Sequence, residues 1–262
     1  MKVLAIMGSP KGKGNGYKVV RRIEENMKQT GDVEFEYLFL KEANLGLCKG
    51  CFVCVPKGER LCPLKDDREK IEQKILDSDG VILSSPGYVF NVSWLMKNFI
   101  DRFAYSNHRL RFFNQKVLLV ANSGGAGLEE TLKSMRNALG GAKIVYELAV
   151  PTPPWPVTPG MEQKNEKKIG EASKKLHDAM LVKTLSPPKL NDYMRFKFLK
   201  TISSEVKEYL PADYEFYKDK EYYYDTKISL YNKVMSSILF RIAMTFMKDM
   251  GPNKEAMKKE NK

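Results

Sequence analysis

The chain has 262 residues, of which 43% are hydrophobic and 29% are charged. These proportions are those of an ordinary globular protein, long enough for one full domain and a smaller appendage. The net charge of +12 is spread evenly, since 23 Lys and Arg stand against 17 Asp and Glu in residues 1–160, and 21 against 15 in residues 161–262. With no basic tail and no recognisable nucleic-acid-binding motif, this charge predicts no nucleic-acid partner and only a diffuse preference for acidic or phosphorylated molecules.

The apolar runs of the chain argue against export and membrane insertion. The opening stretch MKVLAIMGSP has an apolar run of only five residues before Gly8, which is too short for a signal peptide. No apolar stretch reaches the length that spans a bilayer. We therefore expect a cytoplasmic protein, in which cysteine thiols stay reduced.

Five apolar runs are typical of buried parallel strands, at residues 2–7, 33–40, 80–86, 116–123 and 143–150. Segments with apolar residues at helical spacing lie between them, at residues 17–31, 66–79, 92–105 and 128–141. Strands that alternate with helices predict an α/β fold with a doubly wound parallel sheet. Because ligands of such sheets bind outside the carboxyl ends of the strands, the loops at those ends are the candidate functional site.

Three of these loops are rich in glycine. GSPKGKGNG (8–16) connects a strand to a helix, where backbone N–H groups and the helix N-terminus can hold a phosphate, with Lys11 or Lys13 adding charge. A plain tight turn is the alternative interpretation of this loop. SPGYVFNVS (85–93) and NSGGAGLEE (122–130) follow the third and fourth strands. Their glycines allow a flat ring to approach the backbone, and Tyr88 and Phe90 can cover such a ring.

All four cysteines lie in LCKGCFVCVPKGERLC (47–62), with the spacing C-x2-C-x2-C-x7-C. Reduced thiols this close together favour metal binding or redox chemistry over disulfides. Three interpretations stay open: ligands of a [4Fe–4S] cluster, ligands of zinc, and thiols that shape a loop without a metal. Zinc is the least favoured of the three, because the third cysteine crowds the first pair.

Several segments resemble a known family. GSPKGKGNGYKVV, SSPGYVFNVSWLMKNFIDRF and NSGGAG are similar to the three FMN-contacting segments of the NAD(P)H-dependent FMN reductase group in the flavodoxin-like superfamily. CKGCFVCVPKGERLCPLKDD resembles the cysteine motif of the iron-sulfur flavoproteins in that group. The resemblance runs from residue 1 to about residue 182. It implies a flavodoxin-like sheet of five strands in the order 2-1-3-4-5, with FMN at the switch point between strands one and three.

The resemblance also implies the site residues. The FMN phosphate would be surrounded by Ser9, Lys11, Asn15, Gly16 and Tyr17. The isoalloxazine would be bordered by Pro86, Gly87, Tyr88, Val89 and Phe90, and its pyrimidine side by Asn122, Gly124, Gly125 and Gly127. A cluster would be held by Cys48, Cys51, Cys54 and Cys62. No catalytic side chain is expected, because hydride and electron transfer belong to the flavin.

Two residues depart from the family pattern. Gly16 stands where the family usually has a threonine, which removes one phosphate hydrogen bond worth about 1 kcal/mol. Trp94 replaces a small residue, and it would either narrow the pocket or fill the core. Lys97, Asp101 and Arg102 match the family pattern, and we expect them to cap and brace their helix rather than to perform catalysis.

The predicted function is that of an FMN-dependent oxidoreductase of the NAD(P)H-dependent FMN or quinone reductase type. NAD(P)H would be the electron donor, and a small molecule or a protein would be the electron acceptor. A [4Fe–4S] cluster would be an intermediate electron carrier between the flavin and the acceptor. The alternative is an iron-sulfur flavoprotein that carries electrons between protein partners. The third hypothesis is a flavodoxin-like fold with a dead site, meaning one that no longer binds FMN. This hypothesis stays open because Gly16 stands in place of the usual threonine.

The rest of the chain predicts an arm and a helical extension. PTPPWPVTPG (151–160) is rich in proline and predicts an arm, and residues 162–182 predict the last helix of a flavodoxin-like domain that spans residues 1–182 and includes the cysteine loop 46–64. Residues 183–262 are expected to form a mainly helical appendage, with residues from 187 onward outside the family resemblance. Its helix ISLYNKVMSSILFRIAMTFMKDMG (228–251) would cover a homo-oligomer interface or the flavin entrance, touch a membrane surface through residues 227–249, or dock an electron-transfer partner.

Overall fold

The computed structural model describes residues 1–246 and groups them into two compact units. The first unit comprises residues 1–51 and 63–184, and the second comprises residues 52–62 together with the described residues 185–246. Residues 52–62, the middle of the cysteine loop, thus group with the extension, whereas the predicted division assigned the whole loop to the first domain. A hydrogen bond from the N–H of Ala212 to the carbonyl oxygen of Pro56, 2.9 Å long, ties the two segments of the second unit together.

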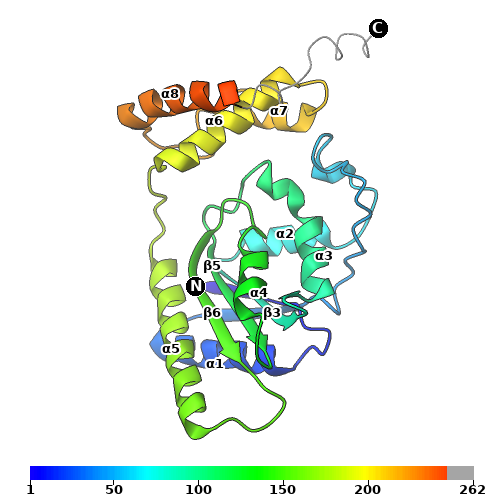
Figure 1. The fold of residues 1–262 in the computed structure, drawn as a ribbon, viewed down its shortest axis with the longest axis vertical. Coiled ribbons are helices and arrows are strands. Elements are labelled where there is room, and N and C mark those ends of the chain that lie inside the picture. The colour runs from blue at the N-terminus through cyan, green and yellow to red at the C-terminus, as the bar shows by residue number, and fades with distance from the viewer. Residues whose placement is uncertain (247–262) are drawn as a thin grey trace. The chain divides into compact units, whose positions relative to one another are not determined.

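A parallel sheet forms the centre of the first unit (Figure 1). Its five main strands lie in the order β2-β1-β3-β5-β6, all pairings between them are parallel, and a short β4 pairs antiparallel with the end of β3. The predicted flavodoxin-like order 2-1-3-4-5 is confirmed, because β4 is only an offshoot of β3. The strands are β1 (Lys2–Met7), β2 (Glu34–Phe39), β3 (Gly80–Tyr88), β4 (Asn91–Val92), β5 (Lys116–Ser123) and β6 (Lys143–Pro151).

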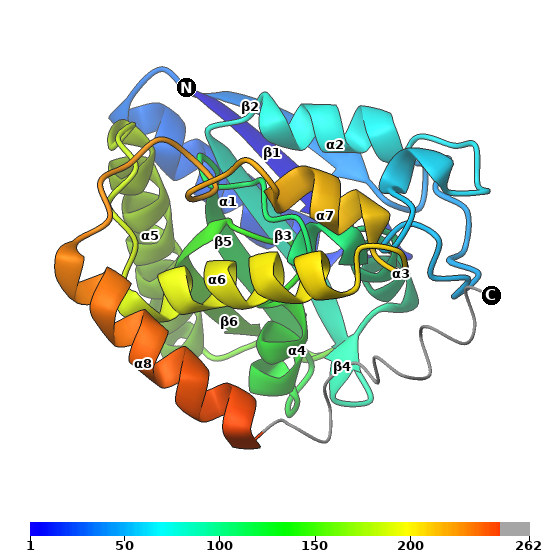
Figure 2. The same ribbon diagram turned by 90° about the horizontal axis from the view of Figure 1, so that it is seen from above.

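Helices cover both faces of this sheet (Figure 2). Helices α1 and α5 pack on one face, where they share a core with Val3, Ala5 and Met7 of β1. Right-handed crossovers place the helices between β2 and β6 on the opposite face. The helices of the first unit are α1 (Asn15–Thr30), α2 (Arg68–Leu76), α3 (Trp94–Arg102), α4 (Leu128–Met135) and α5 (Pro159–Leu181), with a 3-10 turn η2 (Ala104–Asn107) after α3.

The second unit is built on an aromatic core. The buried rings of Phe196, Tyr217 and Tyr222 form its centre, and partly buried tyrosines of the segment YEFYKDKEYYYD pack around them. This tyrosine-dense segment is therefore structural. The unit contains η1 (Glu59–Leu61), α6 (Leu190–Glu205), α7 (Pro211–Tyr217) and α8 (Leu230–Phe246). The end of the helix predicted over residues 228–251 lies outside the described residues.

None of the helices in residues 1–246 is both long enough and apolar enough to cross a membrane.

Candidate functional site

The loop between β1 and α1 folds into a tight turn at the carboxyl edge of the sheet. The N–H of Gly12 donates to the carbonyl oxygen of Ser9 at 3.0 Å, and the N–H of Gly14 donates to that of Gly12 at 2.8 Å. Gly12 has a φ of +67°, a conformation that suits glycine. Helix α1 begins after Gly14, which has no side chain to accept hydrogen bonds from the first-turn N–H groups. Those groups and the helix dipole therefore favour an anion at this position.

Lysine side chains surround this loop. Lys11 and Lys13 are exposed, and the ammonium of Lys13 lies 5.9 Å from the centre of the Tyr17 ring. The side chain of Lys41 packs against the loop, because a Cβ atom added to Gly12 would lie 2.8 Å from its Nζ atom. The sequence analysis missed Lys41. Its position just after β2 was the available signal, since the carboxyl ends of β1 and its neighbour β2 share one edge of the sheet.

The predicted ring-bordering segment forms a strained hairpin between β3 and β4. Val89 and Phe90 occupy its two turn positions with φ values of +49° and +58°, as in a type I′ turn, which normally holds glycine or asparagine. The side chains of Val89 and Phe90 are 94% and 60% exposed. Positive φ at a β-branched residue and at a bulky aromatic residue is rare, and such strain is concentrated at functional sites. The hairpin thus presents an apolar tip to solvent.

The base of this hairpin is fixed to the first loop. The hydroxyl of Ser93 donates to the carbonyl oxygen of Gly8, and the N–H of Ser93 donates to the hydroxyl of Ser85 at 3.0 Å. Ser93 also caps α3 by accepting a hydrogen bond from the N–H of Met96. Trp94, the first residue of α3, is 59% exposed. It does not fill the core, which was one of the two alternatives for this departure.

The glycine loop after β5 packs against the hairpin. A Cβ atom on Gly127, which has a φ of +86°, would lie 3.1 Å from the Cα atom of Phe90, and a Cβ atom on Gly87 would lie 2.8 Å from Oγ1 of Thr131. Only glycine permits these approaches. Gly125, in contrast, has no atom within 4 Å of its Cβ position, so this side of the loop is open.

Gly16 and Asn122 bring the first and third loops together. A Cβ atom on Gly16 would lie 2.8 Å from Oδ1 of Asn122 and 3.1 Å from the hydroxyl of Ser84. At position 16 a residue larger than glycine would therefore displace the Asn122 side chain. Asn122 donates through Nδ2 to Oγ1 of Thr152 at 3.3 Å. Its Oδ1 atom is buried and has no hydrogen-bond partner in the described part of the chain.

The unsatisfied Oδ1 acceptor of Asn122 bears on whether the site can bind a flavin. Buried polar atoms normally have a partner, and a hydroxyl or N–H group of a bound ligand would satisfy Oδ1 of Asn122. The uncapped N-terminus of α1, the open side of Gly125 and the exposed hairpin tip provide an anion site and an apolar border. The residues fit FMN, and their individual roles stay predictions.

Tyr17 of α1 packs against two aromatic side chains of β2. Its ring centre is 5.3 Å from that of Tyr37 and 5.8 Å from that of Phe39. The hydroxyl of Tyr37 donates to the buried carboxylate of Glu24 at 2.6 Å. Burial would raise the pKa of Glu24, but hydrogen bonds from Lys28 and Tyr37 and the charge of Arg21 outweigh it and hold the pKa below its usual range. These contacts give Tyr17 a structural role in addition to the predicted one.

The start of the cysteine loop is anchored to α3. Asn98 accepts a hydrogen bond from the N–H of Cys48 at 2.9 Å and donates to the carbonyl oxygens of Leu45 and Gly46. Arg102 donates to the carbonyl oxygen of Gly46 at 2.7 Å and to both carboxylate oxygens of Asp66. Arg102 therefore braces the cysteine loop, whereas Lys97 and Asp101 form an ion pair on the helix surface.

Asp66 is the centre of this anchor. Its side chain is 6% exposed, and its carboxylate also accepts a hydrogen bond from the N–H of Gly46 at 2.9 Å. Burial would raise the pKa of Asp66. The hydrogen bonds from Arg102 and from the backbone N–H groups of Arg68 and Gly46 outweigh burial and lower the pKa below its usual value.

The four cysteines are divided between the two units. Cys48 and Cys51 are exposed in the first unit, and Cys54 and Cys62 are partly buried in the second. Among residues 1–246, the structure contains no group of three or more His, Cys, Asp or Glu side chains arranged to hold a metal. The metal-ligand role of the cysteines thus stays a prediction.

Comparisons with known proteins agree with this fold. The model of the family described as NADPH-dependent FMN reductase matches residues 1–152. The chain belongs to this family of oxidoreductases. It is similar to two proteins named iron-sulfur flavoprotein: one of Archaeoglobus fulgidus, 30% identical over 84% of this chain and 99% of that protein, and one of Clostridioides difficile, 31% identical over 83% of this chain and 95% of that protein.

The match to the Archaeoglobus protein corrects one expectation. Since 84% of 262 residues is about 220 residues, the similarity extends to residue 220 or beyond, and the prediction that it ends before residue 187 was wrong. Among solved structures, the NAD(P)H:quinone oxidoreductase of Methanothermobacter marburgensis has a TM-score of 0.54 at 15% identity, over 67% of this chain and 96% of that one. At 15% sequence identity, this similarity supports a shared fold and nothing about function.

The contact between Gly16 and Asn122 makes a first prediction. We expect Gly16→Ala to lower the free energy of unfolding by about 1–3 kcal/mol, the usual cost of overpacking. Gly170→Ala is the matched control, since nothing lies within 4 Å of its Cβ position in α5 and alanine favours a helix by up to about 1 kcal/mol. Urea denaturation of both variants measures the difference. A Gly16→Ala protein as stable as the Gly170→Ala protein would show that Asn122 moves aside without cost.

Proposed function

We propose that the chain is an FMN-dependent reductase that takes electrons from NAD(P)H and delivers them to a small-molecule or protein acceptor. The observation that carries this proposal is the convergence of three glycine-containing loops on one sheet edge, with an uncapped helix N-terminus and an orphaned Asn122 acceptor. FMN supplies hydride and electron transfer when it is bound. The protein contributes binding, orientation and electrostatics.

The first loop would bind the phosphate of FMN. The first-turn N–H groups of α1, together with Ser9, Asn15 and Lys11, provide donors and positive charge. Gly16 would allow Asn122 to approach this region, and Lys41 adds a cation that the sequence analysis did not include. The dead-site hypothesis rested on the missing threonine at position 16, and the close approach of Asn122 gives glycine a packing role at this position.

The second and third loops would border the ring system. Residues 86–90 place apolar surface at the hairpin tip, and the open side of Gly125 leaves space for a flat ligand. The backbone of the hairpin is held by Ser85 and Ser93, so the apolar tip does not depend on the ligand for its position. Such preorganisation lowers the cost of binding.

The four cysteines favour a second role for the chain, as an iron-sulfur flavoprotein. We propose that Cys48, Cys51, Cys54 and Cys62 hold a [4Fe–4S] cluster, which accepts four thiolates at short spacings. The similarity to two proteins named iron-sulfur flavoprotein supports this proposal. Zinc binding and metal-free thiols are the competing outcomes. With a cluster, the chain would exchange electrons one at a time with a protein partner.

The first experiment is an ultraviolet-visible spectrum with iron and acid-labile sulfide assays on protein purified without oxygen. We expect flavin bands and about four iron and four sulfide per chain. Cys48→Ser and Cys62→Ser should each lose iron and keep FMN, because the flavin loops lie outside the cysteine segment. Zinc without iron, or flavin without any metal, would refute the cluster. The absence of bound flavin after addition of FMN would refute the reductase itself.

A second assay separates a reductase from an electron carrier. The FMN-loaded protein should oxidise NADH or NADPH when it is given a quinone or free flavin as acceptor. A protein that keeps its flavin but ignores both nicotinamides would be a carrier that is reduced by a protein partner.

An exposed apolar face of α8 supports the proposed membrane-surface contact of residues 227–249, of which residues 247–249 lie outside the described part of the chain. Leu230, Val234, Ile238 and Ile242 recur every fourth residue and are 48–77% exposed, and Arg241 is exposed beside them. This pattern is typical of helices that lie on anionic lipid. The protein should sediment with anionic phospholipid vesicles and not with neutral ones, and Ile238→Glu should abolish sedimentation. If the stripe is instead a homo-oligomer interface, light scattering will detect an oligomer that Ile238→Glu dissociates.

A further inference from the structure

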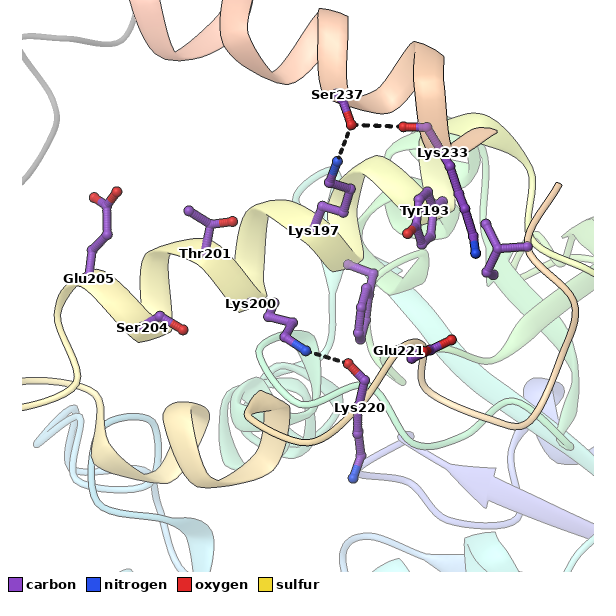
Figure 3. Close-up of a pocket in the computed structure, with 12 residues that line it drawn as sticks. Tyr193, Lys197, Lys200, Thr201, Ser204, Glu205, Lys220, Glu221, Lys233 and Ser237 are labelled. Atoms are coloured by element: carbon purple, nitrogen blue, oxygen red, sulfur yellow. Dashed lines mark hydrogen bonds between the residues drawn. The ribbon is translucent and has the colours of Figure 1, made fainter. Parts of the chain in front are cut away.

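The second unit contains a cavity of about 640 Å³, a volume in the range of small-molecule sites. Figure 3 shows it along α6, with α8 on one side and the segment around Lys220 and Glu221 on the other. Its lining residues on α6 recur three and four positions apart, from Tyr193 to Glu205, so one face of this helix forms the wall.

The cavity has an apolar end and a polar body. Phe196 is 2% exposed and belongs to the aromatic core, and Tyr193 and Ile228 pack partly buried beside it. The remaining wall carries hydroxyl groups, among them those of Thr201 and Ser237. A ligand that combines an apolar or aromatic body with a polar group would match both parts.

Positive charge dominates the polar wall. Four lysines line the cavity against two glutamates. Lys197 donates to the hydroxyl of Ser237 at 2.8 Å, and Lys200 donates to the carbonyl oxygen of Lys220 at 2.6 Å, as the dashed lines in Figure 3 show. Within residues 1–246, neither of these two ammonium groups forms an ion pair with a carboxylate.

The neutral partners of Lys197 leave its charge uncompensated. Burial lowers the pKa of Lys197 below its ordinary value. An anion in the cavity would offset the cost of burying this charge. Lys233 extends from α8 beside Tyr193 in Figure 3 and adds a second cation near the apolar end.

We propose that this cavity binds a small organic phosphate, with its phosphate group at the Lys197 and Lys233 ammonium groups and its apolar or ring-shaped body against Tyr193 and Ile228. Lysines and hydroxyl groups are frequent phosphate ligands, and each charge-assisted hydrogen bond is stronger than a neutral one. All residues that line the cavity belong to the second unit.

The test uses the full chain saturated with FMN, so that the flavin site does not compete for the probe. Isothermal titration calorimetry with adenosine monophosphate should show one binding event per chain, and adenosine should bind at least about tenfold more weakly because it lacks the phosphate. Lys197→Met with Lys233→Met should weaken binding of adenosine monophosphate by about tenfold or more. Lys207→Met, an exposed lysine beyond the end of α6 that does not line the cavity, should leave binding unchanged.

Three results would overturn the proposal. They are the absence of binding by adenosine monophosphate and by inorganic phosphate, equal affinities for adenosine and its monophosphate, and unchanged binding in the Lys197→Met, Lys233→Met protein. Loss of binding through misfolding is recognised by circular dichroism and by the matched Lys197→Arg, Lys233→Arg protein, which should retain binding. The Lys197→Met, Lys233→Met protein assigns the heat of binding to this cavity, so failure of this proposal can be told apart from failure of the proposed reductase function.

Discussion

Replacement of Arg102 by methionine is expected to lower the free energy of unfolding by about 3–5 kcal/mol, the usual cost of breaking a buried ion pair by removing one partner. The side chains of Arg102 and Asp66 are 2% and 6% exposed. Without the guanidinium, the Asp66 carboxylate stays buried with only backbone donors. Urea denaturation monitored by circular dichroism measures the loss.

Lys97→Met is the matched control for this variant. Lys97 lies on the same helix and pairs with Asp101, but its side chain is 55% exposed. An exposed pair contributes about 0–1 kcal/mol, so this variant should be nearly as stable as the unaltered protein. Equal losses in both variants would mean that burial of the Arg102–Asp66 pair contributes nothing.

The same pair predicts a dependence of stability on pH. Since the pKa of Asp66 is lower in the folded chain than its ordinary value of 3.8, the unfolded chain binds this proton first as the pH falls. The stabilisation is fully present above about pH 4 and is lost as the pH falls through the folded pKa. Asp66→Asn should lack this contribution, so the gap in urea midpoint between the two proteins should shrink from pH 7 to pH 3. A constant gap would contradict the assignment.

The loop anchor also connects stability to the proposed cluster. The backbone of Gly46 is hydrogen-bonded to the side chains of both Arg102 and Asp66, and Gly46 lies two residues before Cys48. We therefore expect Arg102→Met to lower the iron content of the protein in addition to its stability. Lys97→Met should not change the iron content.

A protein with Val89→Asn and Phe90→Gly should be more stable than the unaltered chain. Residues in disfavoured backbone regions cost about 1–3 kcal/mol each, and Asn-Gly is the preferred sequence of a type I′ turn. The urea midpoint should rise accordingly. The Kd for FMN should increase about tenfold, because the exposed aromatic surface of Phe90 is lost from the proposed ring border.

Val89→Asn alone separates these two effects. It relieves the strain at one turn position and keeps the ring of Phe90, so stability should rise while FMN affinity stays close to that of the unaltered protein. An unchanged urea midpoint in both variants would show that the hairpin is not strained. An unchanged FMN affinity in the double variant would remove Phe90 from the site.

The centre of the sheet was predictable because β1, β3 and β5 are buried on both faces. Such strands appear in the sequence as nearly continuous apolar runs, and the predictions for residues 2–7 and 116–123 coincide with β1 and β5. The right-handed rule for parallel connections then leaves few strand orders. The glycine loops after β1 and β5 were predictable for the same local reason, whereas residues 85–88 of the second predicted loop belong to β3. The hairpin at Val89 and Phe90 was not, because neither residue type signals a turn with positive φ.

The sequence by itself therefore determined the fold, the edge of the sheet that carries the site and the set of residues available there. Only the tertiary structure decided which of them touch. The contacts of Gly16 with Asn122 and of Arg102 with Gly46 and Asp66 join residues 36 or more positions apart. The grouping of residues 52–62 with the helical extension was likewise visible only in the tertiary structure. Such contacts depend on register and packing across the whole sheet, whereas apolar periodicity and glycine spacing reflect only local backbone preference.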